Sequence, residues 1–270
     1  MTERRRVFAS MLVALCALAP GCVAALKEPR PIADLAGGAP PADPAEAAAL
    51  LSQAETLFAE RDVEKAGTAA RLFLRAASAD GAPIEALLGA VRAEVWLTDH
   101  ESDPGARGRA AAAAVEAAQW CARKAPADPA CDYWLGAALG VQARERPATG
   151  LSALPEIERA FQSALRANPE LDEAGPDRAL ALLYLRAPRW PTGPGDAEVG
   201  LEHARAAVAL RPGHPPNQLA LSEALRATGD SDGSRLAYRR AFDLAQEMAD
   251  RGDRDAPEWA AEARKGLGNR

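Results

Sequence analysis

From residue 45 onward, apolar positions recur at the spacing of amphipathic helices, and proline, glycine or aspartate interrupts each run. Proline removes a backbone donor, and glycine tolerates the left-handed conformation that closes a helix. Breaks such as Asp80-Gly81 and Asn168-Pro169 therefore mark helix ends. The pattern predicts helices near residues 45–60, 63–79, 83–98, 106–124, 130–145, 154–168, 174–187, 196–211, 215–228, 231–249 and 256–266.

The predicted helices come in pairs that resemble one another at a fixed interval. The tetratricopeptide repeat (TPR) places small residues where two helices touch and large residues in the holes between them. Ala207 and Ala241 are 34 residues apart, which is the length of one such repeat. An insertion from Arg144 to Pro155 separates the helices of one pair. The pattern is carried in register by Leu135-Gly136 with Phe161, by Leu180-Ala181 with Tyr184 and Ala207, and by Leu221 with Tyr238 and Ala241.

These pairs predict an all-α fold, a TPR-like helical-hairpin solenoid with insertions, over residues 45–270. One pair cannot bury its apolar face alone, so stacked neighbours form a continuous core and a curved superhelix with a concave face. The composition agrees, because 66 residues are alanine and only 20 are valine, isoleucine or threonine. A sheet needs β-branched and aromatic residues on its faces, so this composition argues against barrels, sandwiches and doubly wound sheets.

The first residues have the pattern of a secretion signal. Arg4 to Arg6 form a positive region, and Val7 to Ala19 form an apolar stretch of 13 residues, which is too short for a membrane-spanning anchor. Small residues before Cys22 resemble a bacterial lipobox, so residues 1–21 are predicted to be a lipoprotein signal peptide and Cys22 the acylated residue. Ordinary cleavage near this point, with Cys22 incidental, is the alternative.

An acylated protein of this kind would face the periplasm from a membrane surface. Val23, rather than aspartate, follows the cysteine, which for such lipoproteins implies the outer membrane. Residues 22–44 are rich in proline, glycine and alanine and show no helical period, so they are predicted to be a flexible tether. The net charge is −6 and no basic stripe follows the signal, which argues against nucleic-acid binding.

Two further cysteines lie beyond the signal, at Cys121 and Cys131. They bracket a proline-containing loop, and in an oxidising compartment a disulfide would join the end of one helix to the start of the next. Two buried free thiols in an alanine-rich core are the other interpretation. Two isolated cysteines without a neighbouring histidine do not form a zinc set, and no metal site is predicted.

A set of short segments between Trp134 and Asp230 carries a resemblance to a known family. They are Tyr133-Trp134-Leu135-Gly136, Leu154-Pro155-Glu156-Ile157, Asn168-Pro169, Gly175-Pro176-Asp177-Arg178, Leu183-Tyr184-Leu185-Arg186-Ala187-Pro188-Arg189-Trp190-Pro191, Gly195-Asp196 and Glu202-His203. With these segments the sequence resembles the TatT family, the TPR lipoproteins associated with tripartite ATP-independent periplasmic (TRAP) transporters. The resemblance implies an α-helical lipoprotein that forms a homotrimer, associates with a periplasmic solute-binding protein and passes a small organic ligand through a channel.

Five residues are candidates for ligand or partner binding: Tyr133, Trp134, Arg178, Tyr184 and Trp190. Each has a structural alternative. The aromatic pair at 133 and 134 would pack in the core, Arg178 would pair with a neighbouring carboxylate instead of a ligand, and Trp190 would cover a repeat edge. An arginine fork is suited to a carboxylate ligand, which is why Arg178 is included.

Catalysis has no visible basis in the sequence. His100, His203 and His214 share no metal-binding spacing, and the chain contains no His-Glu-x-x-His, no phosphate-binding glycine loop and no Gly-x-Ser-x-Gly elbow. We therefore expect a protein that is not an enzyme and needs no cofactor. The first functional hypothesis is a membrane-anchored accessory component of a TRAP-type solute-uptake system, and the alternative is a general cell-envelope scaffold for outer-membrane or cell-wall assembly.

Overall fold

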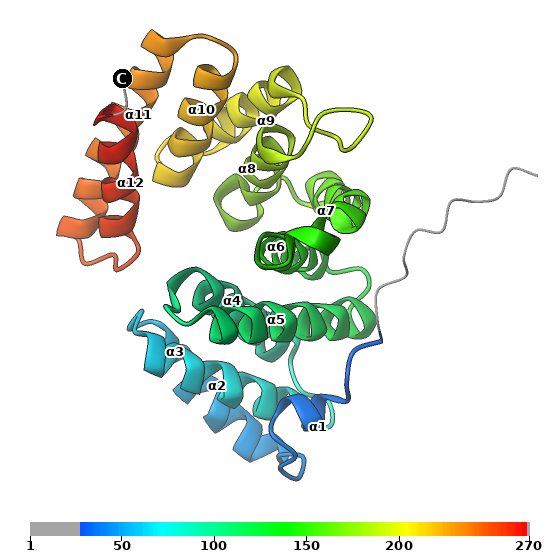
Figure 1. Ribbon diagram of the computed structural model, residues 1–270. Helices are drawn as coiled ribbons and strands as arrows, with labels where there is room; N and C mark the ends of the chain where they lie inside the picture. The colour runs from blue at the N-terminus through cyan, green and yellow to red at the C-terminus, as the bar shows by residue number, and fades with distance from the viewer. Residues whose placement is uncertain (1–27, 269–270) are drawn as a thin grey trace, which may run out of the picture.

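The computed structural model describes residues 28–268, and this part of the chain contains twelve helices and no strand (Figure 1). Their bounds follow the predicted helices to within a few residues at most ends. The helices are α1 (Ile32–Leu35), α2 (Pro44–Phe58), α3 (Val63–Ala77), α4 (Ile84–His100), α5 (Pro104–Lys124), α6 (Pro129–Glu145), α7 (Pro147–Ala167), α8 (Leu171–Arg186), α9 (Ala197–Leu210), α10 (Pro215–Ala227), α11 (Ser231–Asp250) and α12 (Ala256–Gly268).

Local chemistry fixes most helix starts. An aspartate before the helix accepts a backbone N–H from the first turn, and a proline at the first position lacks the N–H that would otherwise be unpaired. The Asp43 side chain, for example, accepts from the Glu46 N–H at 2.8 Å, directly before Pro44. The other capping aspartates are Asp62, Asp103, Asp128, Asp196 and Asp230.

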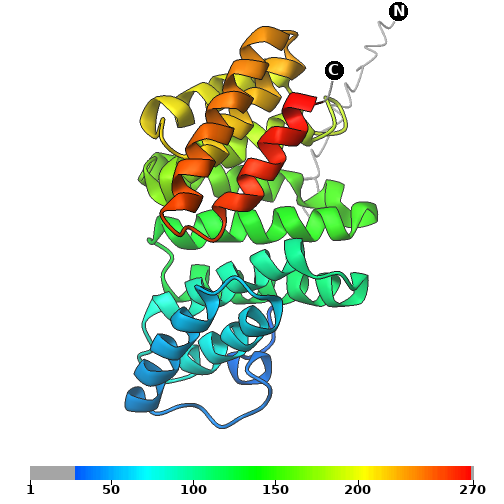
Figure 2. The ribbon, with the colours of Figure 1, turned by 90° about the vertical axis from the view of Figure 1, so that its left-hand side faces the viewer.

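The helices pack as consecutive antiparallel hairpins, and the TPR-like solenoid predicted from the sequence is confirmed. Each even-numbered helix from α2 to α12 also contacts the next even-numbered helix, so these helices line one face of the stack. Figures 1 and 2 show that the stack curves around this inner face. The odd-numbered helices from α3 to α11 therefore lie on the outside.

Glycine and alanine allow close packing of the hairpins. A Cβ atom at Gly136 of α6 would lie 2.6 Å from the ring of Phe161 of α7, so the aromatic ring occupies the space that a side chain would take. Both residues belong to the repeat pattern found in the sequence. The same arrangement recurs at Gly89 with Phe73 and at Gly266 with Tyr238.

The insertion predicted between Arg144 and Pro155 is not a loop. Only Arg146 separates α6 from α7, which begins at Pro147 and continues through Pro155. The proline costs one backbone hydrogen bond, but Leu154 and Ile157 on either side of it are buried in the main core. Packing therefore overrides the local signal, and the inserted residues lengthen the hairpin.

The structure also differs from the predicted tether over residues 28–44. Ile32 of α1 and Ala42 are buried in a cluster with α3 and α5. The Trp120 indole donates to the Arg30 carbonyl at 2.7 Å, and Arg30 pairs with Glu116 at 2.9 Å. These residues therefore belong to the folded domain. Residues 22–27, the signal peptide and Cys22 lie outside the described residues.

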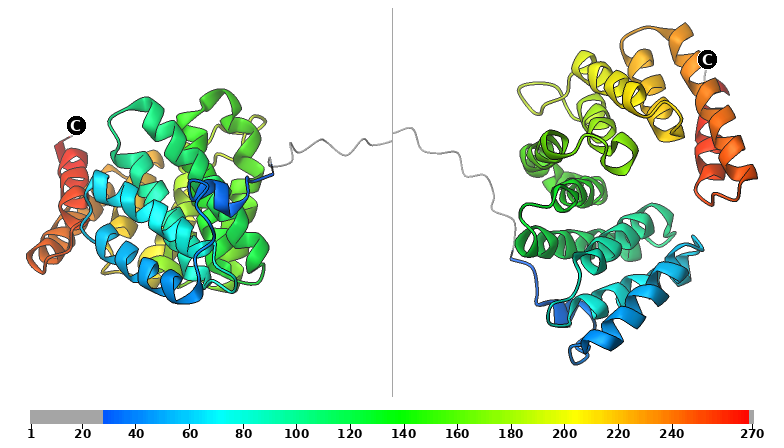
Figure 3. Two further views of the ribbon diagram at one scale, coloured as in Figure 1. Left: turned by 90° about the horizontal axis from the view of Figure 1, so that it is seen from below. Right: turned by 180° about the vertical axis from the view of Figure 1, so that it is seen from behind.

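The two ends of the solenoid contact each other. Arg61, directly before α3, pairs with Asp255, directly before α12, at 2.7 Å, and these residues are 194 positions apart. His100 at the end of α4 lies 3.0 Å from the Glu258 carboxylate of α12. We call Arg61, His100, Asp255 and Glu258 the clasp. Figure 3 shows the α11–α12 turn facing α3 and α4. Across the described residues, every helix is too short or too polar to cross a membrane.

Candidate functional site

A network centred on Arg178 joins α6, α8 and α10. The guanidinium donates to the Asp172 carboxylate at 2.7 Å, to the Asn217 side-chain oxygen at 2.9 Å and to the Tyr133 hydroxyl at 3.4 Å. It also donates to the backbone carbonyls of Asp172 and Glu173, both at 3.2 Å. We call these five residues the Arg178 hub.

The hub surrounds a left-handed turn at the start of α8. Asp172, Glu173 and Ala174 have φ values of 49°, 56° and 65°. For residues with a Cβ this conformation costs about 1–2 kcal/mol each. Arg178 and Asn217 together satisfy the Glu173 carbonyl, the latter at 2.9 Å, so the hub offsets the cost of the turn.

Tyr133 approaches this turn from α6. Its hydroxyl donates to the Asp172 carboxylate at 2.6 Å. A Cβ atom on Gly175 would lie 2.6 Å from the same hydroxyl oxygen, so the approach requires glycine at that position. Burial is the main cause that raises the pKa of Tyr133, and the Asp172 carboxylate raises it further although Arg178 opposes the shift. The hydroxyl therefore remains protonated and serves as a donor, not as an acid or base.

Tyr184 belongs to a second polar group. Its hydroxyl donates to Glu158 at 2.6 Å, and its ring stacks on His203 with centroids 5.6 Å apart. The Asp177 carboxylate completes the group and lies 2.7 Å from His203 Nδ1. Burial, and after it the bond to Glu158, raises the pKa of Tyr184. This group joins α7, α8 and α9 and carries no unpaired nucleophile.

His214 lies beside the hub at the start of α10. Burial, followed by the positive charge of Arg178, lowers its pKa to about 3. Its ring meets Trp259 of α12 edge-on, with centroids 5.5 Å apart. At neutral pH it is therefore an uncharged packing group on the inner face.

An apolar groove of about 510 Å³ opens between α6, α7 and α8. It lies where the lengthened α6–α7 hairpin extends past the end of α8. Val141, Leu151 and Leu183 contribute to its apolar lining, and Arg144 and Arg186 are its charged residues. Arg186 pairs with Glu223 at 2.7 Å and Arg144 pairs with Asp99, so each cation already has an acidic neighbour.

The structure brings together two of the five predicted binding residues, Tyr133 and Arg178, and their partner Asp172 matches the structural alternative for Arg178. Trp134 is half-buried and meets Tyr133 edge-on at 5.2 Å. Tyr184 lies in the separate group, and Trp190 is 87% exposed on the loop between α8 and α9. None of the five lines the apolar groove.

Sequence reasoning missed Asn217 and the groove. Asn217 lies in the next repeat, 39 positions beyond Arg178, and no local pattern links the two. The groove combines residues of the inserted segment, such as Leu151, with residues of α8, such as Leu183, and no local pattern links the two segments.

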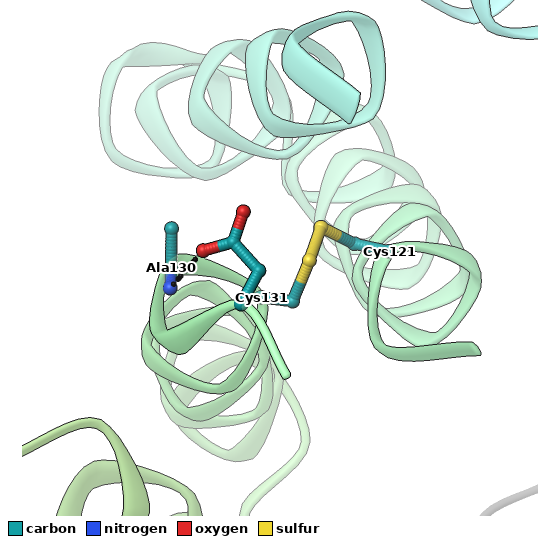
Figure 4. The surroundings of a disulfide bond; sticks show 4 residues. Cys121, Ala130 and Cys131 are labelled. Carbon is teal, nitrogen blue, oxygen red and sulfur yellow. Dashed lines mark hydrogen bonds between the residues drawn. A yellow bond between two sulfur atoms is a disulfide. The ribbon is translucent and has the colours of Figure 1, made fainter. Parts of the chain in front are cut away.

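Cys121 and Cys131 form a disulfide in the structure, which corresponds to the first of the two interpretations of these residues. Figure 4 shows that it joins the end of α5 to the start of α6. Both cysteines are buried. Residues 28–268 contain no group of three histidine, cysteine, aspartate or glutamate side chains that could hold a metal ion.

Comparisons with known proteins agree with the architecture. No family model matches the chain, and no curated protein matches it. Among solved structures, a thermophilic TPR protein of Thermus thermophilus matches with a TM-score of 0.60 at 21% sequence identity, covering 81% of this chain and 99% of that one. This likeness shows the fold.

Proposed function

We propose that this chain is a non-catalytic, lipid-anchored TPR protein that serves as an accessory component of a TRAP-type solute-uptake system. The observation that carries the proposal is the apolar groove, because a plain stack of TPR hairpins has no inserted turn to create one. Part of its lining, namely Leu154, Ile157, Leu183 and Arg186-Ala187-Pro188, belongs to the segments in which the sequence resembles the TatT family.

In this proposal the groove holds a small organic ligand and the inner face binds a periplasmic solute-binding protein. The apolar lining suits the body of the ligand, and the Arg186 side chain, which is 57% exposed, suits a polar end. Acylation at Cys22 would hold the protein in the outer membrane, facing the periplasm, and three copies would assemble as a homotrimer.

Affinity capture from membranes tests the proposal. The full acylated chain, cross-linked in intact cells and purified, is expected to retain a solute-binding protein of a TRAP system and to sediment as a trimer. A monomer that retains outer-membrane or cell-wall assembly proteins would instead favour the general envelope scaffold.

A groove-filling variant tests the ligand separately. A Cβ atom at Gly140 of α6 meets nothing within 4 Å, and Gly140 lines the groove, so Gly140→Leu is chosen to fill it. Gly108→Leu on α5 is the matched control, because that position is also open. Native mass spectrometry is expected to find a small organic molecule bound to the wild type and to Gly108→Leu but not to Gly140→Leu. Equal occupancy in all three proteins would refute the groove as the ligand site.

A further inference from the structure

We propose that one edge of the domain lies on the surface of the lipid bilayer and places Trp190 among the headgroups. We call this the Trp190 edge, and it consists of the α6–α7 turn with Leu151 and the α8–α9 loop with Arg189 and Trp190. The inference rests on the proposed lipid anchor, and the experiment below separates the two.

Exposed apolar side chains are concentrated at this edge. Within residues 28–268 the exposed large apolar side chains are Leu151 at 48%, Trp190 at 87% and Leu236 at 68%. Leu151 lines the apolar groove together with Pro188, which is two positions from Trp190, so two of the three lie at one rim. Tryptophan favours the membrane interface because its ring is apolar and its N–H is polar.

The α8–α9 loop holds Trp190 outward on an ordered support. The Gly195 N–H donates to the Pro188 carbonyl at 2.8 Å, and the Asp196 N–H donates to the Tyr184 carbonyl at 2.9 Å. A Cβ atom on Gly193 would lie 2.7 Å from the Pro188 carbonyl oxygen, so this close approach needs glycine. Backbone hydrogen bonds therefore hold the loop in a defined conformation, and Trp190 is exposed in that conformation.

Arginines gather at this edge, although Arg144 is paired with Asp99 and Arg186 with Glu223. The protein carries a net charge of −6, yet exposed Arg144, Arg146, Arg186 and Arg189 all lie on the α6–α7 turn or beside the loop. Basic residues next to aromatic and aliphatic side chains attract anionic headgroups while the apolar groups insert. Arg189 directly precedes Trp190, and both residues are exposed.

The proposed anchor leaves the domain close to the membrane. Six residue steps separate Cys22 from Glu28, and an extended chain spans at most about 3.3–3.6 Å per residue, or roughly 20 Å in all. Glu28 is held by Arg123 near the end of α5 at 2.9 Å. Figures 1 and 3 place the start of the described chain and the α8–α9 loop on the same side of the molecule. A bilayer within reach of the anchor therefore meets this side.

Quenching of tryptophan fluorescence by brominated lipids tests the inference. The full acylated chain is reconstituted into vesicles of phosphatidylethanolamine and phosphatidylglycerol, with or without bromine on the upper acyl chain. The other four tryptophans are half-buried, so Trp190 is the one exposed for contact with lipid. Brominated lipid is expected to quench the wild type and Leu236→Ala, and the quenched fraction is expected to disappear in Trp190→Phe. Leu236 lies on α11, away from the edge, which makes it the matched control.

The outcomes distinguish the edge from the anchor. Vesicle flotation and mass spectrometry of the N-terminal peptide report acylation independently of fluorescence. Acylated protein that floats with vesicles but shows equal quenching in the wild type and in Trp190→Phe overturns the edge and leaves the anchor intact. Trp190 that becomes shielded only when another envelope protein is added also overturns it, in favour of a protein contact. Protein that is neither acylated nor bound to vesicles overturns both proposals.

Discussion

Replacing Arg178 by alanine tests whether the hub supports the fold. The side chain is 13% exposed and donates to five acceptors on Tyr133, Asp172, Glu173 and Asn217. The Asp172 carboxylate is 40% exposed and would be hydrated after the change, so the cost comes from the hydrogen bonds that the guanidinium makes. A hydrogen bond to a charged group contributes about 1.5–3 kcal/mol. Because the left-handed turn would also lose the contacts that offset its strain, we expect Arg178→Ala to lower the free energy of unfolding by about 2–4 kcal/mol. Urea unfolding followed by far-UV circular dichroism measures this change.

Two further variants serve as controls. Arg178→Lys keeps the charge, but one ammonium group cannot reproduce the planar fork, so it should recover only part of the loss. Arg235→Ala removes a surface pair with Asp232, in which the side chains are 65% and 86% exposed. Such pairs contribute about 0–1 kcal/mol, so this variant should unfold almost like the wild type.

Replacing Glu173 by glycine should remove part of the backbone strain of the left-handed turn. Glu173 has φ 56°, and its carboxylate makes only a 3.4 Å surface contact with Arg211. Glu173→Gly should therefore raise the free energy of unfolding by about 1 kcal/mol, because glycine adopts this conformation without the steric cost. A loss below about 1 kcal/mol in Arg178→Ala, or a clear loss in Glu173→Gly, would refute the role assigned to the hub.

Three other changes test the remaining structural features. Burial raises the pKa of Glu94 to about 8, above the value of about 4.3 in an unfolded chain. The free energy of unfolding should therefore fall as the pH rises from about 4 to 8. Glu94→Gln should abolish this fall in urea titrations at pH 5 and pH 8. Replacing Cys121 and Cys131 by serine should lower the free energy of unfolding by about 2–3 kcal/mol, since the disulfide closes a short loop; an unchanged urea midpoint would contradict this. Asp255→Asn should weaken the clasp and lengthen the distance between spin labels on α3 and on the α11–α12 turn, and 1 M salt should do the same to the wild type. An unchanged distance distribution would show that other contacts hold the ends together.

Sequence by itself determined the helices and their order. Helix ends depend on groups within a few positions, such as the Asp128 side chain that accepts from the Ala130 N–H, so their signals are local. The repeat is visible because each hairpin must place small residues opposite large ones, as Gly136 and Phe161 do. A local rule failed at Pro155, where the burial of neighbouring side chains outweighed the loss of one hydrogen bond.

Tertiary structure alone decided where the polar side chains meet. Arg178, Asn217 and Tyr133 come from different hairpins, and no period relates them, because a network depends on how stacked helices are rotated and not on spacing along one helix. The clasp between Arg61 and Asp255 follows from the accumulated curvature of the whole solenoid. Small rotations at each hairpin add up over the stack, and only their sum determines which charged residues of the two ends come into contact.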